Sequence, residues 1–424
     1  MSDSQRGGKT GEPYRRFLAR LQEVRRQGVS LGLDRVRLAL ERLGSPERRV
    51  PAVHIAGTNG KGSCAALTDS ILRHAGLRTG LFTSPHLTRF TERIRIDGAE
   101  IDGDRLAFLD DAVAATAVPL TFFEVSAVLA FLAFAEEKVD VAILETGLGG
   151  RLDATSVCHP VACAITSIAL DHEAILGNTL SAIAYEKACI AKPGIPLFLG
   201  PLASEADERI AEVARATGAP VFRPGADYPS APAASALSGS HQLANAALAV
   251  AISRQAAKAV GRPLASDEIL RGLAEVRWPG RLERIADVLL DCAHNVEGAT
   301  ALVAALPQAP RRVLVTSIVR DKNAAGMLSV LAPQFDCVVL TRSQSDRAAD
   351  PQQLATLVSA TKGGDRQVVC VEDPVAALAV ARRQVGEAGG GLVVVAGSIF
   401  LVCELRAHLL GQGDGPAEAS DPLP

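Results

Sequence analysis

The sequence has little of what marks several common classes of protein. Its formal net charge is only −3 over 424 residues and no basic block is visible, which argues against nucleic acid and anionic membranes as partners. Aromatic residues make up 4% of the chain, too few for a surface that stacks bases. No apolar stretch approaches the roughly 20 residues of a membrane-spanning helix, and the polar N-terminus lacks the apolar core of a signal peptide.

The cysteines are informative through their spacing. Eight are present, all scattered singly, and none forms a C-x-x-C pair. This pattern argues for a reducing compartment and against a disulfide framework or a zinc site. No internal repeat of solenoid period is present either. These absences together predict a soluble, cytoplasmic protein.

The chain is long enough for two domains, because a single core rarely grows past roughly 250 to 300 residues. Apolar runs of strand length alternate with helical patterns, which predicts an α/β fold with mostly parallel strands and helices on both faces. The predicted strands are residues 51–56, 139–145, 161–168, 196–199, 286–291, 312–317, 336–341, 367–371 and 391–396. They are too many for one compact sheet of the usual size.

A domain boundary is predicted at Trp278-Pro279-Gly280, which combines two strong chain breakers with the only tryptophan. The Pro-, Ala- and Ser-rich stretch 224–240 is a competing boundary. We therefore expect a larger domain over residues 13–277 and a smaller one over 278–410. The tails, 1–12 and 411–424, are rich in Gly, Ser, Asp and Pro and are expected to be disordered.

The most specific motif is a glycine loop at residues 57–63 (Gly-Thr-Asn-Gly-Lys-Gly-Ser), between the first predicted strand and a helix predicted over 64–75. Its glycines let the backbone approach phosphate oxygens, and the helix N-terminus turns free N–H groups toward the anion. Lys61 would reach the β- and γ-phosphates and Ser63 the magnesium. The loop is shorter than the usual phosphate loop, so a simple glycine-rich turn stays open as the alternative.

Other polar residues follow predicted strands. Glu145 ends one strand, where a magnesium ligand belongs, although a solvated carboxylate is the alternative. His172 follows the next strand and could bind metal or be structural. Residues 83–87 (Thr-Ser-Pro-His-Leu) offer hydroxyls and an imidazole, or only a turn. Lys187, judged on its residue type alone, is expected to be a helix-surface lysine.

The second half repeats this arrangement. Asp291, His294 and Asn295 follow a predicted strand, and Asn295 alone is explained as a helix cap. Asp321 and Lys322 follow the next strand. Polar strand ends in both domains predict a cleft between them.

Taken in chain order, these motifs resemble the folylpolyglutamate synthase and dihydrofolate synthase branch of the Mur ligases. The matching segments are 31–35, 57–63, 83–87, 91–93, 123–124, 145–155, 166–172, 186–188, 279–281, 291–295, 321–322 and 397–398. The shortened glycine loop is the form that this family carries.

The resemblance implies a P-loop-type, mostly parallel domain at 13–277, which binds ATP and the pterin, and a smaller Rossmann-like ligase domain at 278–410. It implies a monomeric, ATP-dependent ligase that adds L-glutamate to 7,8-dihydropteroate and to folylpoly-γ-glutamate. The γ-phosphate would pass to the substrate carboxylate, and the glutamate amine would then displace phosphate from the acyl phosphate. Positioning and charge neutralisation are what such a reaction requires of a protein.

The resemblance also assigns residues. The nucleotide contacts would be Thr58, Asn59, Gly60, Lys61, Gly62, Ser63, Asn245, Arg281 and Asp291. Two magnesium ions would be held by Ser84, Glu145, His172 and a carbamylated Lys187, which reverses the interpretation of that lysine. Lys61, Glu145, His172 and Lys187 would be the catalytic set. The pterin-side contacts would be Val29, Ser30, Leu31, Thr121, Phe122, Phe123, Glu124, Asp153 and Ala154.

One departure from the family pattern concerns the sequence after Gly397-Ser398, where the resemblance implies a histidine in a Gly-Ser-Phe-His type run and this chain has Ile399-Phe400-Leu401. It affects the expected substrate contacts of the smaller domain.

Three alternatives to a bifunctional enzyme stay open. A monofunctional folylpolyglutamate synthase would use the same loops. A peptidoglycan-precursor ligase is disfavoured by the 31–35 and 123–124 segments. A nucleotide-responsive binding protein without turnover would have no need of Glu145, His172 and Lys187.

Overall fold

The computed structural model describes residues 11–25, 28, 32–233, 235–361 and 366–411. These residues separate into two compact units. The first comprises the described residues of Met1–Ser230 and Ala247–Leu273, and the second those of Ala231–Ala246 and Ala274–Ala417. Compact units need not coincide with functional domains, so the limits 13–277 and 278–410 stay a prediction.

An eight-stranded sheet organises the first unit, in the order β4-β3-β2-β5-β1-β6-β7-β8. The strands are β1 Ala52–Ala56, β2 Thr79–Phe82, β3 Ile94–Ile96, β4 Ala99–Glu100, β5 Val141–Glu145, β6 Pro160–Ile165, β7 Leu197–Leu199 and β8 Val221–Phe222. All pairs from β2 to β8 in this order are parallel, and β3 and β4 extend the edge antiparallel. The central strands β1 and β5 are buried along their whole length, as expected for a sheet covered on both faces.

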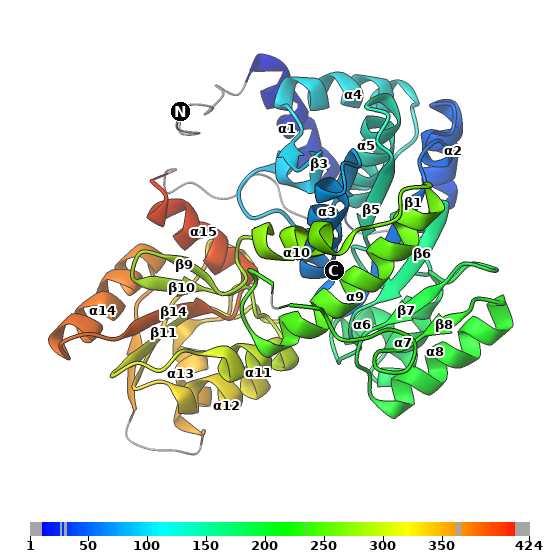
Figure 1. Cartoon of the computed structure of the whole chain (residues 1–424). Coiled ribbons are helices and arrows are strands. Elements are labelled where there is room, and N and C mark those ends of the chain that lie inside the picture. Colours follow the sequence, from blue (N-terminus) through cyan, green and yellow to red (C-terminus); the bar gives the residue numbers. More distant parts are fainter. Residues whose placement is uncertain (1–10, 26–27, 29–31, 234, 362–365, 412–424) are drawn as a thin grey trace. The chain divides into compact units, whose positions relative to one another are not determined.

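Helices enclose this sheet (Figure 1). They are α1 Glu12–Arg25, α2 Asp34–Arg42, α3 Lys61–His74, α4 Gly103–Ala115, α5 Phe122–Glu136, α6 Glu173–Leu176, α7 Leu180–Ala188, α8 Ser204–Thr217, α9 Ser240–Ala259 and α10 Ser266–Glu275, with short 3₁₀ turns η1 Pro46–Arg48, η2 Phe90–Arg93 and η3 Ala154–Val157. The part of α9 up to Ala246 and the part of α10 from Ala274 belong to the second unit. Helix α5 is apolar on all sides and shares a core with α1, α2 and α4. Helix α3 is buried almost throughout, and its Ser70 Oγ donates to the Gly272 carbonyl at 2.8 Å. The helix behind the glycine loop is therefore held firmly.

The second unit has a six-stranded sheet in the order β13-β12-β11-β14-β10-β9. Its strands are β9 Glu283–Ile285, β10 Val288–Leu290, β11 Arg312–Thr316, β12 Cys337–Leu340, β13 Gln367–Cys370 and β14 Leu392–Ala396, and its helices are α11 Val296–Ala305, α12 Ala324–Leu331, α13 Pro351–Ser359, α14 Pro374–Glu387 and α15 Ile399–Leu409, with the 3₁₀ turn η4 Ala332–Gln334. Only β9 is antiparallel. Helices α11, α12 and α13 form one core with the sheet, and Figure 1 shows α14 on its other side. This is a doubly wound, Rossmann-like arrangement.

The predicted fold class is confirmed, since the chain forms two mostly parallel sheets with helices on both faces. Several details of the prediction were wrong. The strand predicted over 161–168 ends at Ile165. The helix predicted over 64–75 begins at Lys61, because Gly60 adopts φ +84° and precedes the helix directly. The strand predicted over 286–291 is shorter, because Ala286 adopts φ +53° in the turn between β9 and β10. The short strands β2, β3, β4, β8 and β9 were not among the predicted strands.

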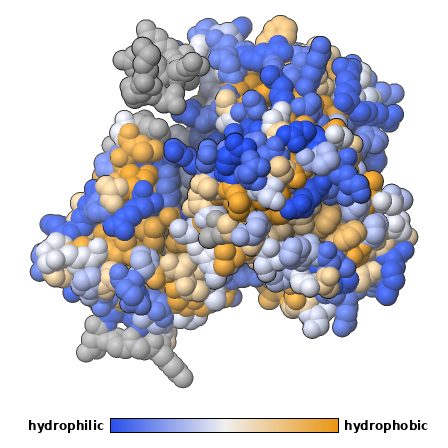
Figure 2. All heavy atoms as spheres, viewed as in Figure 1, coloured by the Kyte–Doolittle hydropathy of each residue, from blue (hydrophilic) through white to orange (hydrophobic). Residues whose placement is uncertain are grey.

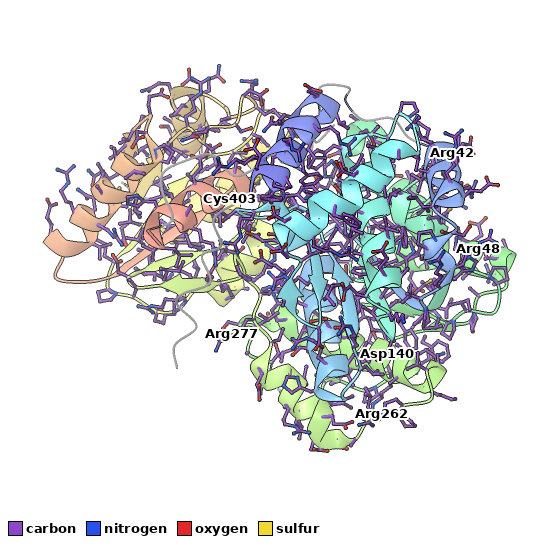
Figure 3. The ribbon with its side chains drawn as sticks, turned by 90° about the horizontal axis from the view of Figure 1, so that it is seen from above. Arg42, Arg48, Asp140, Arg262, Arg277 and Cys403 are labelled. Atoms are coloured by element: carbon purple, nitrogen blue, oxygen red, sulfur yellow. The ribbon has the colours of Figure 1, made fainter. Side chains whose placement is uncertain are left out.

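The surface is mixed in character. Figure 2 shows hydrophilic residues interspersed with smaller hydrophobic areas on this face. Large exposed apolar side chains come from separate elements: Leu38, Phe108, Leu170, Tyr185, Leu243, Leu270 and Leu410. Within the described part of the chain, no helix is both long and apolar enough to cross a bilayer. Arg42, Arg48 and Arg262 lie at separate outer positions in Figure 3, so these charges are dispersed.

Candidate nucleotide and metal site

Four motifs from distant parts of the sequence meet at one edge of the first sheet. Strands β2, β5, β1 and β6 are adjacent and parallel, so their carboxyl ends open onto the same edge. Ser84 follows β2, Glu145 ends β5, the glycine loop 57–63 follows β1, and His172 follows β6. This edge is where ligands collect in open α/β sheets. The structure thus brings these predicted site residues into one region.

The glycine loop is anchored on the segment that follows β6. The Thr58 N–H donates to the Ser167 carbonyl at 2.8 Å, and the Asn59 N–H donates to Ser167 Oγ at 3.0 Å. Gly57 adopts φ +150°, and a Cβ there would lie 1.9 Å from Thr166 Oγ1. The loop can therefore approach β6 this closely only with glycine at position 57.

Replacing Gly57 with alanine is expected to destabilise the protein and weaken nucleotide binding. The Cβ would clash with Thr166 and strain the backbone, at a combined cost of about 2 to 4 kcal/mol. Gly76→Ala is the matched control, since Gly76 also has positive φ (+77°) but nothing within 4 Å of its added Cβ. Thermal unfolding and calorimetric titration with ATP measure both effects. Equal destabilisation of the two variants would contradict the steric argument.

Two lysines point to the same backbone oxygen of the loop. Lys61 Nζ donates to the Gly57 carbonyl at 3.1 Å and to the Thr58 carbonyl at 3.2 Å, and Lys187 Nζ donates to the Gly57 carbonyl at 2.9 Å. Lys187 is only 4% exposed, so its interpretation as a helix-surface lysine was wrong. Burial, followed by the charge of Lys61, lowers the pKa of the Lys187 amine to about 7. An amine with this pKa is largely neutral, and hence nucleophilic, in mildly alkaline solution.

Ser84, Glu145 and His172 lie on neighbouring loops of the same edge. The Ser84 N–H donates to Glu145 Oε2 at 3.2 Å, and the Glu145 side chain is buried. His172 adopts φ +51° at the start of α6, and its ring Nε2 lies 4.0 Å from Asp171 Oδ1. Asp171 acts on the site as well, since its charge raises the pKa of Lys187 against the larger effect of burial.

The predicted donor set fits magnesium only in part. A hydroxyl, a carboxylate and an imidazole suit a hard divalent cation in part, because such ions prefer oxygen ligands. Across the residues that the structure describes, no group of three or more His, Cys, Asp and Glu side chains could hold a metal. The predicted set includes only two such residues, Glu145 and His172. It fits magnesium only if Ser84 and an anionic form of Lys187 complete it.

Asp153 and Ala154 belong to a tight segment that follows Glu145. The Asp153 carboxylate accepts from the N–H groups of Gly147 (2.8 Å), Leu148 (3.0 Å) and Thr155 (3.0 Å) and from Thr155 Oγ1 (2.5 Å). Burial raises the pKa of Asp153. The structure gives this carboxylate a structural role, and its contact with the pterin stays a prediction, as does that of Ala154.

The other predicted pterin residues lie at the start of α5. Thr121 and Glu124 form a capping box, in which Glu124 Oε2 accepts from the Thr121 N–H at 2.7 Å, and Glu124 also pairs with Arg35 at 2.8 Å. The Phe123 ring packs against Gly147, where a Cβ would come within 2.5 Å of it. Phe122 is fully buried. Val29, Ser30 and Leu31 fall outside the described residues.

The second unit brings together the remaining predicted nucleotide contacts. Asp291 accepts from the N–H groups of Leu282 (3.0 Å) and Ala293 (2.9 Å). Burial raises the pKa of Asp291, and the charge of Arg281 opposes this effect. Asn245 Nδ2 donates to Gln242 Oε1 at 2.9 Å on α9.

His241 was missed by the sequence analysis. It lies one helical turn before Asn245, and the charges of Asp291 and Arg281 both act on its ring. Burial lowers the pKa of His241, which favours the neutral form of the ring. Its spacing from Asn245 was the only signal that could have revealed it.

The departure after Ser398 has a simple structural outcome. Ser398 Oγ accepts from the Phe400 N–H at 3.2 Å and caps α15, while Leu401 is fully buried. Apolar residues therefore extend the packing of α15 at this point.

Comparison with known proteins places the chain in a family. A dihydrofolate synthase/folylpolyglutamate synthase of Bacillus subtilis (strain 168) is 34% identical over 421 residues, which cover 90% of this chain and 96% of that protein. The chain belongs to the dihydrofolate synthase/folylpolyglutamate synthase family of the Mur ligases. Residues 280–399 match the family model described as "Mur ligase, glutamate ligase domain". The predicted family is thereby confirmed.

Some relatives of this synthase family are longer. A probable bifunctional folylpolyglutamate synthase/dihydropteroate synthase of Haloferax volcanii is 34% identical over 421 residues, which cover 91% of this chain. The chain spans about half (49%) of that protein's length.

Solved structures of the family share the whole fold. A Mycobacterium tuberculosis folylpolyglutamate synthase complexed with ADP and AMPPCP matches with a TM-score of 0.86 and 32% identity, covering 95% of this chain and 100% of that one. A bifunctional enzyme from Yersinia pestis complexed with AMPPNP and a Mn ion matches with a TM-score of 0.83 and 30% identity, covering 95% and 99%.

Proposed function

We propose that this chain is an ATP-dependent ligase that adds L-glutamate to 7,8-dihydropteroate and to folylpoly-γ-glutamate. The main support is the convergence of the glycine loop, Ser84, Glu145 and His172 at one edge of the first sheet, with Lys187 on the loop carbonyl. The relatives' names and their complexes with ADP, AMPPCP and AMPPNP point to the same chemistry.

The chain's own residues would act mainly by positioning and charge. The loop N–H groups and Lys61 would hold the ATP phosphates and neutralise charge as the γ-phosphoryl group moves to the substrate carboxylate. The amine of glutamate would then attack the acyl phosphate, and phosphate would leave. Asn245, Arg281 and Asp291 would contact the nucleotide, and a site shared by the two domains stays a prediction.

Two magnesium ions would be held by Ser84, Glu145, His172 and a carbamylated Lys187. As Lewis acids, the ions would neutralise the charge of the phosphates. The carbamate forms when the neutral amine attacks CO₂, giving a new N–C bond and releasing one proton. It replaces a cation that would repel magnesium by an anionic oxygen ligand. The burial of Lys187 and its lowered pKa support this step.

The proposal is tested with purified protein, MgATP and glutamate, offered either 7,8-dihydropteroate or a tetrahydrofolate. The bifunctional enzyme should form an amide with both, each coupled to ADP release. Turnover on the reduced folate alone would favour a monofunctional folylpolyglutamate synthase. ATP binding without any amide product would favour a nucleotide-responsive binding protein. Monomeric state and cytoplasmic location stay predictions.

A further inference from the structure

A buried histidine lies on the central strand of the first sheet, outside the predicted nucleotide and metal sites. His54 is the only polar residue of β1 and its side chain is fully buried. Burial, with a smaller effect from Lys192, lowers its pKa to about 3, so the imidazole is neutral. Burying a neutral imidazole in a protein core costs free energy unless its polar atoms are hydrogen-bonded.

The hydrogen bonds of Thr155 determine which ring nitrogen of His54 carries the proton. His54 Nε2 lies 2.8 Å from Thr155 Oγ1. The single Thr155 hydroxyl proton is donated to Asp153 Oδ1 at 2.5 Å. Nε2 must therefore be the donor to Thr155. His54 Nδ1 has no hydrogen-bond partner among the described residues. With the proton on Nε2, Nδ1 carries only a lone pair. Burying an unpaired lone pair costs less free energy than burying an N–H group without an acceptor.

The hydrogen bonds from His54 through Thr155 lead to Asp153, which also binds the backbone N–H groups of Gly147 and Leu148, close to Glu145 in the chain. The hydrogen-bond partners of the Asp153 carboxylate are all donors: the N–H groups of Gly147, Leu148 and Thr155, and the Thr155 hydroxyl. It therefore acts as an acceptor at every contact. The direction of donation runs from His54 through Thr155 to Asp153.

The segment held in this way, residues 146–157, contacts both ends of the proposed metal site. It begins directly after Glu145. Farther along, the Arg151 N–H donates to the Glu186 carbonyl at 2.9 Å, and a Cβ on Gly150 would lie 3.1 Å from the Lys187 carbonyl. A shift of this segment would therefore move Glu145 relative to Lys187.

We propose that His54 is a positioning residue, which holds segment 146–157 through Thr155 and Asp153 and so fixes Glu145 relative to Lys187. Its effect on rate rests on the proposed ligase function. The hydrogen-bond chain itself is open to test without substrate.

The first test is NMR of the ¹⁵N-labelled full chain. His54 should show the Nε2–H tautomer and no titration between pH 5 and 8, and Thr155→Val should shift its Nε2 resonance. A control is His159, which is exposed and near the other end of the same segment, and whose resonances Thr155→Val should shift less. An Nδ1–H tautomer, or a His54 resonance that Thr155→Val leaves unmoved, would overturn the proposal, whatever reaction the protein catalyses.

The second test is kinetic. His54→Leu should lower kcat about 10- to 100-fold and raise the Mg²⁺ concentration needed for half-maximal rate, with little change in the KM for glutamate. His54→Gln, whose amide can donate to Thr155, should recover most of the rate. Thr155→Val should have an effect like that of His54→Leu, and the double variant should lose no more than the worse single variant.

Additive losses in the double variant, or an unchanged Mg²⁺ requirement in His54→Leu, would overturn the positioning role. If His54→Leu does not fold, Thr155→Val, which removes the hydroxyl that links His54 to Asp153, supplies the same readout, and Thr155→Ser, which keeps the hydroxyl, is its control. Absence of ligation in the unsubstituted protein would instead refute the proposed function, and the NMR result would still decide on the hydrogen-bond chain.

Discussion

Lys61→Ala is expected to lower kcat for glutamate addition by about 100- to 1,000-fold, the usual loss when one preorganised charge or donor is removed from a transition state. Lys61 Nζ lies on the carbonyls of Gly57 and Thr58, at the start of α3, where the helix N-terminus also favours an anion. Lys61 is the only lysine of the glycine loop 57–63. ADP release and amide formation, measured at saturating ATP, report the loss.

The matched control is Lys258→Ala, which removes an exposed lysine at the end of α9. It should keep full activity, and both variants should unfold at similar temperatures. Lys61→Ala should also raise the pKa of Lys187, because the like charge of Lys61 is one cause of its depression. Near-normal turnover by Lys61→Ala would contradict the phosphate role of this lysine.

Lys187→Ala is expected to be nearly inactive, with a loss in kcat of about 100-fold or more, because it removes the proposed carbamate ligand. Added short-chain carboxylic acids should restore part of the activity by placing a carboxylate in the space of the lost side chain. Lys187→Arg fills the space with a cation that forms no carbamate, so the same acids should not rescue it. Full activity of Lys187→Ala without added acid would exclude the carbamate.

The pKa of Lys187 gives this prediction a pH dependence. Because the pKa is about 7, lowering the pH below 7 protonates the amine and should suppress carbamate formation. The unsubstituted enzyme, depleted of CO₂ and assayed at pH 6, should therefore regain activity with bicarbonate more slowly than at pH 8. Lys187→Ala rescued by an acid should show no dependence on bicarbonate.

Much of the fold was predictable because its strands are long and apolar. Strands such as β1 and β5 are buried on both faces, so their sequences are continuous apolar runs that stand out from the helical patterns. Strands β3, β4 and β8 have two or three residues, too few for an alternating pattern to be recognised. Their pairing depends on neighbours already in place.

The sequence by itself determined the glycine loop, the polar residues that follow each strand, and the family, since these depend on residue types at fixed local spacings. Only the tertiary structure decided the environment of each side chain. In the folded chain, the buried Lys187 donates to the Gly57 carbonyl, and His54 is hydrogen-bonded to Thr155. The Asp153 carboxylate accepts from the backbone N–H groups of Gly147 and Leu148. Burial and hydrogen bonding arise between residues far apart in the chain, so no local pattern encodes them. These contacts, and not residue type alone, set the protonation states on which the proposed chemistry depends.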